Sequence, residues 1–277
     1  MLLRIIQSKD NARVKELRRA LAQPGRDAKG LVGIEGPKML EEALRAGLRV
    51  ATVFVAAGAE SLPEKLGVAS ETEILVLPKQ ILDSALATET PQSIAALVEP
   101  RDWSWTDILG ARGGAALIVV LAGVQDPGNL GTILRSAEAF GASGVVSLPG
   151  TVSAWNSKAV RASAGSVFRV PLVTASERIC LEQLREAGVH ILATTVRGTE
   201  PADRVNMAGP TALLIGNEGN GVANELVSKS DGKITIPCPG PVESLNAAMA
   251  ATVLLYEAAR QRAAVSGGPA AHRGAQR

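Results

Sequence analysis

Three segments of the chain place polar side chains just after apolar runs, where the ligand sites of α/β proteins usually lie. In the first, an Asp-Pro-Gly turn after the run ending near Leu121 brings Asn129 to the start of a helix that also contains Arg135. A guanidinium at this position could bind a phosphate or stabilise a developing oxyanion. An arginine considered alone is more often a surface cation, so this segment does not identify a site by itself.

The other two segments combine loop residues with polar groups that a loop does not need. Leu213–Gly221 is an apolar run leading into a loop with three glycines in six residues, which lets backbone approach a ligand closely. Glu218 stands among these glycines, where turning alone requires no carboxylate. In Ile236–Ala250, three prolines stiffen a loop before a long Ala-rich helix. Ser244 can cap this helix, and Asn246 falls in its first turn.

Known nucleotide-binding loops do not account for these segments. The first has no Gly-Lys-Ser/Thr of a Walker loop and lacks the Gly-x-Gly-x-x-Gly spacing of dinucleotide-binding enzymes. A nucleotide-dependent oxidoreductase, which the alternation of strands and helices would allow, is therefore disfavoured. Taken separately, each segment could be only a turn, a loop or a capped helix.

The first fifty residues carry an excess of positive charge. They hold 11 Lys and Arg against 6 Asp and Glu, whereas the remainder of the chain holds 18 against 21. A helix capped by Asp10 or Asn11 would bury Val14, Leu17 and Leu21 on one face. Its other face carries Arg13, Lys15, Arg18 and Arg19. A basic face suits a polyanionic partner, and a merely solvated helix face explains the charge equally well.

Apolar runs and turn residues divide the chain into two α/β domains. Residues 1–99 are expected to form a small α/β domain, 100–114 a linker, 115–263 a larger domain and 264–277 a disordered tail. In the larger domain, strands that are apolar on both faces indicate a parallel sheet covered on two sides. The expected strands are 31–35, 50–55, 73–77, 93–98, 116–122, 144–148, 189–194, 212–215 and 233–236. The longer expected helices are one after Asn11, one from Pro37 to near Gly47, and 128–140, 176–187, 222–227 and 244–262.

Composition excludes several classes of protein. No apolar run is long enough to cross a bilayer, and the N-terminus lacks the apolar core of a signal peptide, so we expect a soluble, cytoplasmic protein. Cys180 and Cys238 are too few for a disulfide framework and have no metal-ligand spacing. With only two histidines in the chain, neither a zinc site nor a histidine-dependent triad is expected.

Together, the three segments resemble the three signature motifs of the SpoU (TrmH-like) RNA 2′-O-ribose methyltransferases of the SPOUT superfamily. The resemblance covers about Ala115 to Arg262. It is carried, in order, by the spacing of Asn129 and Arg135, the Gly216-Asn-Glu-Gly219 loop and the Glu243-Ser-Leu-Asn246 run. The N-terminal domain is similar, more loosely, to the L30e-like RNA-binding domain of this family. Its cues are Ser8-Lys-Asp-Asn11, the Arg18-Arg19 helix and Ile34-Glu-Gly-Pro-Lys38.

The resemblance implies a fold that pattern reasoning does not find. Family members thread the C-terminal part of the parallel α/β sheet through a loop and so form a trefoil knot, whereas the pattern alone favours an unknotted Rossmann-like sheet. Family members are homodimers with the active site at the subunit interface. The apolar face of the last helix, with Leu245, Met249, Val253 and Tyr256, suits such a partner and would also suit an ordinary core.

The resemblance also implies S-adenosylmethionine as the cofactor and assigns the residues that bind it. Adenine needs apolar walls and a few amide partners, which these positions can offer. The cofactor-binding residues implied are Thr194, Thr195, Val196, Gly198, Ile215, Gly216, Asn217, Gly219, Ile236, Pro237, Cys238, Leu245 and Ala247.

For the reaction, the resemblance implies direct displacement by a ribose 2′-oxygen on the sulfonium methyl group, with no metal. Family arguments make Arg135 the base, but a guanidinium normally stays protonated and is better suited to clamping phosphate, so both roles stay open. Asn129 would orient Arg135 or the ribose. Glu218 would hold the arginine or stabilise the knot. Ser244 and Asn246 would position the cofactor and the target ribose.

Lys38, in the L30e-like part, is also expected to bind RNA, and three further residues resemble family positions that face RNA: Lys158, Arg161 and Ser163. A capped helix with exposed cations is the structural alternative for the last three. Phosphate contacts from such cations would position a folded RNA without reading its sequence. The two-domain layout fits 23S ribosomal RNA best, with transfer RNA next. A noncatalytic RNA-binding protein of the same fold is the remaining alternative.

Overall fold

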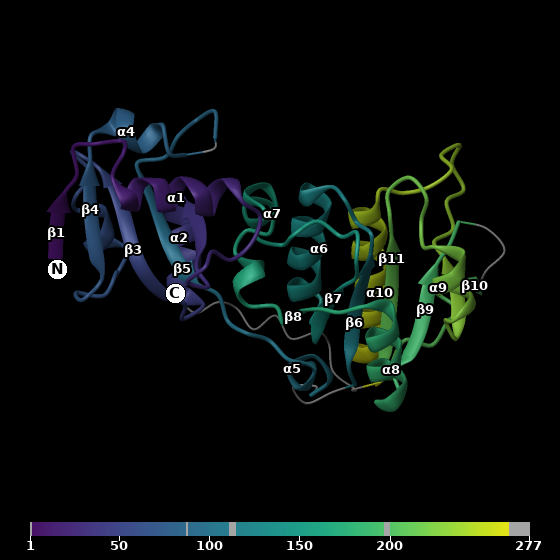
Figure 1. Cartoon of the computed structure of the whole chain (residues 1–277). Helices are drawn as coiled ribbons and strands as arrows, with labels where there is room; N and C mark the ends of the chain where they lie inside the picture. Colours follow the sequence, from purple (N-terminus) through teal and green to yellow (C-terminus); the bar gives the residue numbers. More distant parts are fainter. Residues whose placement is uncertain (1, 87, 111–114, 197–199, 266–277) are drawn as a thin grey trace. The chain divides into compact units, whose positions relative to one another are not determined.

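The chain forms two compact units. In the computed structural model, which describes residues 2–86, 88–110, 115–196 and 200–265, unit 1 comprises Met1–Asp102 together with Ser153–Arg169. Unit 2 comprises Trp103–Val152 and Val170–Arg277. Each unit has its own sheet (Figure 1). Within the described ranges, no helix combines the length and apolar character that a membrane span requires.

Unit 1 is built on a five-stranded sheet of order β1-β4-β3-β5-β2. Strands β1, β4 and β3 are parallel, whereas β5 runs antiparallel to both β3 and β2. The strands are β1 (Leu2–Ile5), β2 (Val32–Glu35), β3 (Arg49–Ala56), β4 (Glu73–Leu77) and β5 (Ile94–Glu99). The helices are α1 (Ala12–Ala22), α2 (Pro37–Arg45), α3 (Leu62–Lys65), α4 (Lys79–Asp83), α7 (Ser157–Ala162) and the 3-10 turn η1 (Ser166–Phe168).

Local sequence explains where the first two helices begin. Asn11 caps α1, because its side chain accepts a hydrogen bond from the Arg13 amide at 2.9 Å. The apolar stripe of α1 is buried against sheet residues that include Phe54 and Leu97. Helix α2 starts at Pro37, a residue whose missing N–H costs nothing in a first turn.

Unit 2 is built on a seven-stranded, all-parallel sheet of order β10-β12-β9-β11-β6-β7-β8. Its strands are β6 (Leu117–Ala122), β7 (Gly144–Ser147), β8 (Leu172–Thr174), β9 (His190–Thr194), β10 (Glu200–Pro201), β11 (Thr211–Gly216) and β12 (Gly232–Thr235). Its helices are α5 (Trp105–Leu109), α6 (Pro127–Ala139), α8 (Glu177–Glu186), α9 (Asn224–Ser228) and α10 (Ala247–Val265). Because β12, β9, β11 and β6 are consecutive parallel neighbours, their carboxyl ends meet at one edge of the sheet.

Two helices that carry site residues pack together. Helices α6 and α10 lie side by side, and α10 also contacts β11 (Figure 1). Small buried residues of α10, including Ala248 and Ala251, allow close packing, and the Ser136 and Thr252 hydroxyls share a hydrogen bond of 2.7 Å between the helices. This packing fixes the start of α10 next to the start of α6.

The structure differs from the expected elements at four places. The expected linker contains helix α5, whose Ile108 is fully buried in the core of unit 2. The segment Ser153–Arg169 groups with unit 1, although it lies inside the expected domain of residues 115–263. Strands β1, β8 and β10, which are two to four residues long, were not expected. Helix α10 begins at Ala247 and not at Ser244. The expected tail, from residue 266 onward, lies outside the described residues.

Candidate functional site

A pocket lies at the carboxyl ends of β9, β11 and β12. Its volume is about 710 Å³, and the start of α10 closes one side. The structure brings together here twelve of the residues expected to bind the cofactor: Thr194, Thr195, Val196, Ile215, Gly216, Asn217, Gly219, Ile236, Pro237, Cys238, Leu245 and Ala247. Gly198 lies outside the described residues. Glu218 and Ser244, expected as catalytic residues, also line the pocket.

Sequence reasoning missed part of the pocket wall. The additional lining residues include Asn220, Asn224, Lys233, Val242 and Leu254. Asn224 is the first residue of α9 and follows the glycine loop. Lys233 lies on β12, just before the expected cofactor-binding residues 236–238. Their closeness in sequence to the motifs was the available signal. Leu254 is different, because only the fold of α10 brings it to the pocket.

The glycine loop has a geometry that its residues dictate. A Cβ on Gly216 would lie 2.1 Å from the carbonyl carbon of Gly221, so no other residue fits. The side-chain amide of Asn217 stabilises the loop through both its oxygen and its nitrogen. Its Oδ1 accepts from the amides of Gly219 (2.9 Å) and Asn220 (3.2 Å), and its Nδ2 donates to the carbonyl of Gly123 (2.9 Å). Asn217 thereby ties this loop to the end of β6.

Glu218 is bound to the first turn of α6. Its carboxylate accepts from the amides of Gln125 and Asp126, both at 3.2 Å, and from Asn129 Nδ2 at 2.8 Å. Burial raises the pKa of this carboxyl, but hydrogen bonds from Asn129 and from backbone amides, including that of Glu218 itself, outweigh burial and lower it below its ordinary value. Asp126 is the N-cap of α6, because its side chain accepts hydrogen bonds from the amides of Gly128 and Asn129.

Asn246, and not Ser244, caps α10. Asn246 Oδ1 accepts from the amides of Ala248 (2.9 Å) and Met249 (3.3 Å), which is the bonding pattern of an N-cap. The expected Ser244 cap is therefore wrong, since the loop continues two residues further. Asn246 Nδ2 donates to Asn129 Oδ1 at 3.0 Å, so the first and third sequence segments are in direct contact.

Arg135 lies apart from this hydrogen-bonded group. It is exposed on α6, and it makes no hydrogen bond or ion pair with any residue in the described part of the chain. The expectation that Asn129 or Glu218 holds it is not met by a contact in this structure, because both side chains bind each other. An exposed guanidinium with no protein partner keeps all its donors for a ligand.

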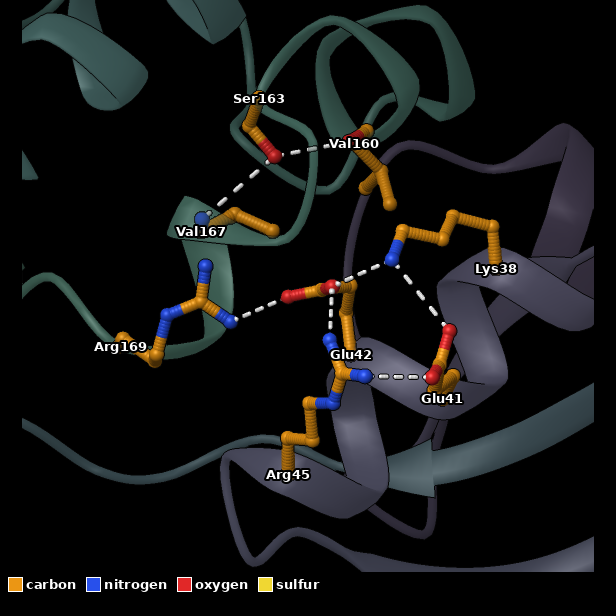
Figure 2. A network of polar contacts seen from close by, with 8 residues as sticks. All are labelled: Lys38, Glu41, Glu42, Arg45, Val160, Ser163, Val167 and Arg169. Carbon is orange, nitrogen blue, oxygen red and sulfur yellow. Dashed lines mark hydrogen bonds and ion pairs between the residues drawn. The ribbon is translucent and has the colours of Figure 1, made fainter. Parts of the chain in front are cut away.

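Most cations expected to bind RNA have partners within unit 1. Arg13 pairs with Glu16 and Glu73, and Lys15 lies 3.2 Å from Asp10. Arg18 makes two contacts of 3.4 Å with Ser84. Figure 2 shows Lys38 between Glu41 (3.3 Å) and Glu42 (3.0 Å). In the resolved set, Arg19 and Arg161 have no side-chain partner. The exposed cations Lys15 and Lys38 can still exchange a carboxylate for a phosphate, since surface pairs contribute little energy.

The segment from α7 to η1 corrects one expected RNA contact. Lys158 and Arg161 are exposed, as contact with RNA requires. Ser163, however, is fully buried, and its hydroxyl donates to the Val160 carbonyl at 2.7 Å (Figure 2). A side chain without exposed surface cannot reach RNA, so Ser163 serves the turn after α7 instead.

A buried carboxylate fastens this segment to α2. Glu42 lies 2.7 Å from Arg169, 3.0 Å from Lys38 and 3.3 Å from Arg45 (Figure 2). Gly165, with φ of +90°, lies directly against it, and a Cβ there would come within 2.6 Å of the Glu42 Cβ. Glu42 and Gly165 thus fix α7, with Lys158 and Arg161, to the N-terminal sheet.

The fold and the site together define a class of protein. A parallel α/β sheet with a pocket at its strand ends, a polar cluster beside that pocket and a separate basic α/β unit are typical of a cofactor-using enzyme that acts on a polyanion. Comparison with known families agrees. The model of the SpoU rRNA Methylase family matches residues 116–256, and that of the MRM3-like substrate binding domain matches residues 11–96. The chain belongs to the SpoU rRNA methylase family.

Individual relatives match over nearly the whole chain. The 23S rRNA (guanosine(2553)-2′-O)-methyltransferase RlmP of Bacillus subtilis is 34% identical over 91% of this chain and 97% of its own. The AdoMet-bound rRNA methyltransferase of Sinorhizobium meliloti has a TM-score of 0.82 at 30% identity, covering 93% of this chain and 98% of the other. The SpoU methyltransferase AviRb of Streptomyces viridochromogenes, in complex with AdoMet, has a TM-score of 0.80 at 31% identity, covering 91% and 98%.

Proposed function

We propose that this protein transfers a methyl group from S-adenosylmethionine to a ribose 2′-hydroxyl of 23S ribosomal RNA. One observation carries the proposal: the three motif segments converge at one sheet edge, where Glu218, Asn129 and Asn246 bond to one another beside the pocket. The RlmP relative, which is named for this reaction on 23S rRNA, supports the choice of substrate.

The pocket residues fit S-adenosylmethionine. Ile215, Ile236 and Leu245 supply apolar walls for an adenine ring. The hydroxyl oxygen of Thr195 is buried at the pocket without a hydrogen-bond partner among the described residues, and a bound nucleoside would supply one. When bound, S-adenosylmethionine supplies an electrophilic methyl group on a sulfonium. The pocket residues would bind and orient it.

The protein's own residues would prepare the ribose. Arg135 is proposed to clamp an RNA phosphate or to stabilise the ribose oxygen as its proton leaves. Glu218 is proposed to hold the glycine loop against α6. Ser244, exposed at the pocket, would contact the cofactor or the target ribose. Unit 1 would bind RNA through its cations Arg13, Lys15, Arg18, Arg19, Lys38, Lys158 and Arg161.

A homodimer and a trefoil knot are part of the same proposal. Met249, Val253 and Tyr256 are 62%, 42% and 56% exposed along one face of α10, an apolar stripe that a second copy would cover. The knot would thread the C-terminal segment past the glycine loop, and the contact of Asn246 with Asn129 supports such a close passage. A cytoplasmic location is proposed because that is where the RNA substrate would be.

The proposal is tested with the full chain in two assays. Isothermal titration with S-adenosylmethionine should show saturable binding, and an unmodified 23S rRNA transcript should acquire a ribose methyl group at one nucleotide. Methylation of a transfer RNA and not of 23S rRNA would show that the protein is a transfer RNA methyltransferase. Saturable RNA binding without cofactor binding would leave only a noncatalytic RNA-binding protein.

A further inference from the structure

A line of hydrogen bonds joins Glu218 to the start of α10 through two asparagine amides. Asn129 Nδ2 donates to Glu218 Oε1 at 2.8 Å, and Asn246 Nδ2 donates to Asn129 Oδ1 at 3.0 Å. Asn246 Oδ1 in turn accepts from the amides of Ala248 and Met249. We call these three side chains, Glu218, Asn129 and Asn246, the amide relay.

The two ends of the amide relay fix its direction. A backbone N–H can only donate, so the oxygen of Asn246 must face α10 and its nitrogen must face Asn129. An ionised carboxylate can only accept, so the nitrogen of Asn129 must face Glu218. The hydrogen bonds that lower the pKa of Glu218 keep it ionised near neutral pH. Each end alone therefore requires the same orientation of both amides.

This orientation leaves N–H donors available to a ligand. Each amide nitrogen carries two hydrogens, and the relay uses one of each. The second hydrogens have no partner among the residues that the structure describes. Asn246 is exposed and Asn129 is partly exposed, so a ligand can reach them. Asn246 Oδ1 already accepts two hydrogen bonds, so at its ligand side this residue offers a donor and not an acceptor.

We propose that Asn129 and Asn246 form a donor pair that binds the target ribose oxygen, and that Glu218 is a positioning residue that fixes the direction of the pair. The inference rests on the proposed function, because that oxygen is the nucleophile of the reaction. A bond forms between O2′ and the methyl carbon while the methyl–sulfur bond breaks and leaves its electron pair on sulfur. The hydroxyl proton passes to water.

The donors act on the charge that develops on this oxygen. As the proton leaves, O2′ becomes negative, and hydrogen bonds to it strengthen more in the transition state than in the ground state. Donors whose orientation is fixed in advance need no reorganisation at that moment. The relay supplies this orientation from a carboxylate at one end and a helix start at the other.

Asn246→Asp tests the donor pair, because aspartate still caps a helix but has no N–H to offer. Asn129 would turn its nitrogen toward the new carboxylate and leave its oxygen facing Glu218. We expect kcat for a 23S rRNA transcript to fall about 100-fold, as for loss of one oxyanion donor. The affinity for S-adenosylmethionine should change little, and the unfolding temperature should fall. Asn206→Asp is the matched control, since exposed Asn206 makes the same kind of contact with the Ala208 amide away from the site.

A double variant separates donation from structure. With Glu218→Gln added to Asn246→Asp, the glutamine amide can donate to Asn129 Oδ1, and the relay can form in reverse. Because Glu218 Oε1 also accepts from the Asp126 amide, Glu218→Gln has a cost of its own, so the two single variants and the double variant are compared in a double-mutant cycle. The double variant should lose less unfolding temperature than the sum of the two single variants, whereas kcat should stay about 100-fold low, because the Asn246 donor is still missing. Recovery of kcat would overturn the donor pair, as would near-normal kcat in Asn246→Asp. Additive losses of the unfolding temperature would overturn the positioning role of Glu218. Failure of the proposed function is distinct, because the unaltered protein would then bind no S-adenosylmethionine or methylate no RNA.

Discussion

Arg135 is exposed on α6 and has no partner among the residues with described positions, so the role we propose for it in the reaction would rest on contact with RNA. Arg135→Ala should lower kcat by a factor of about 100 to 1,000, the range for removing a group that stabilises developing charge. S-adenosylmethionine affinity should be preserved, because Arg135 does not line the pocket. Single-turnover methylation and calorimetry measure the two quantities.

The lysine variant distinguishes the two roles that the sequence leaves open. Arg135→Lys keeps a positive charge but loses the planar fork that binds a phosphate through two hydrogen bonds. If Arg135 clamps a phosphate, Arg135→Lys should therefore keep part of the methyltransferase activity, and the main change should be a higher KM for RNA. Near-normal turnover in Arg135→Ala would show that the residue does not take part in the reaction.

At the scale of elements, the sequence predicts long periodic segments and misses contacts that depend on the fold. The apolar run of β6 and most of helix α6 were predictable, because burial leaves a local pattern, whereas the cap Asp126 was taken as part of a turn. The motif residues could be identified from the sequence, but which of them hydrogen-bond to one another could not. Asn246 belongs to the same constellation as Asn129 only because α10 packs beside α6, and the two residues are 117 positions apart. The burial of Ser163 likewise depends on a turn that packs against α2.

Helix α10 is also fastened at its far end, by Arg262. This half-buried guanidinium donates to the backbone carbonyls of Ala115, Ala116, Met207 and Gly209. Burial lowers the pKa of Arg262, and the carbonyls compensate by satisfying its donors. Arg262→Met leaves these carbonyls without their donor, and we expect the free energy of unfolding to fall by about 3 kcal/mol.

Urea unfolding of full-length variants measures this change. Arg260→Met is the matched control on the same helix, because Arg260 is exposed and pairs with nearby Glu257. The control should change the free energy of unfolding by no more than about 0.5 kcal/mol. Equal losses in both variants would show that the Arg262 contacts do not fasten α10.

At the scale of the whole molecule, the exposed apolar stripe on α10 bears on assembly. Met249, Val253 and Tyr256 recur at helical spacing on one face of α10. Within the same chain, the Tyr256 ring packs edge-on against Phe140 at the end of α6, with ring centroids 5.8 Å apart. A contiguous exposed apolar face of this kind marks an interaction site in soluble proteins. The stripe continues directly from Asn246, so a second copy seated on it would lie next to the amide relay.

Val253→Glu places a charge in the middle of this stripe. In a twofold dimer centred on this stripe, Val253 of each copy would lie near the axis, so two carboxylates would approach each other and dimerisation should weaken about 100-fold or more. Sedimentation velocity should show a dimer for the unaltered chain and a monomer for Val253→Glu at the same concentration. Ile179→Glu is the control, because Ile179 is 39% exposed on α8, a different helix of unit 2. If methyl transfer needs the partner copy, Val253→Glu should also lose turnover in proportion to its monomer fraction, and a monomeric unaltered chain with full turnover would contradict the dimer proposal.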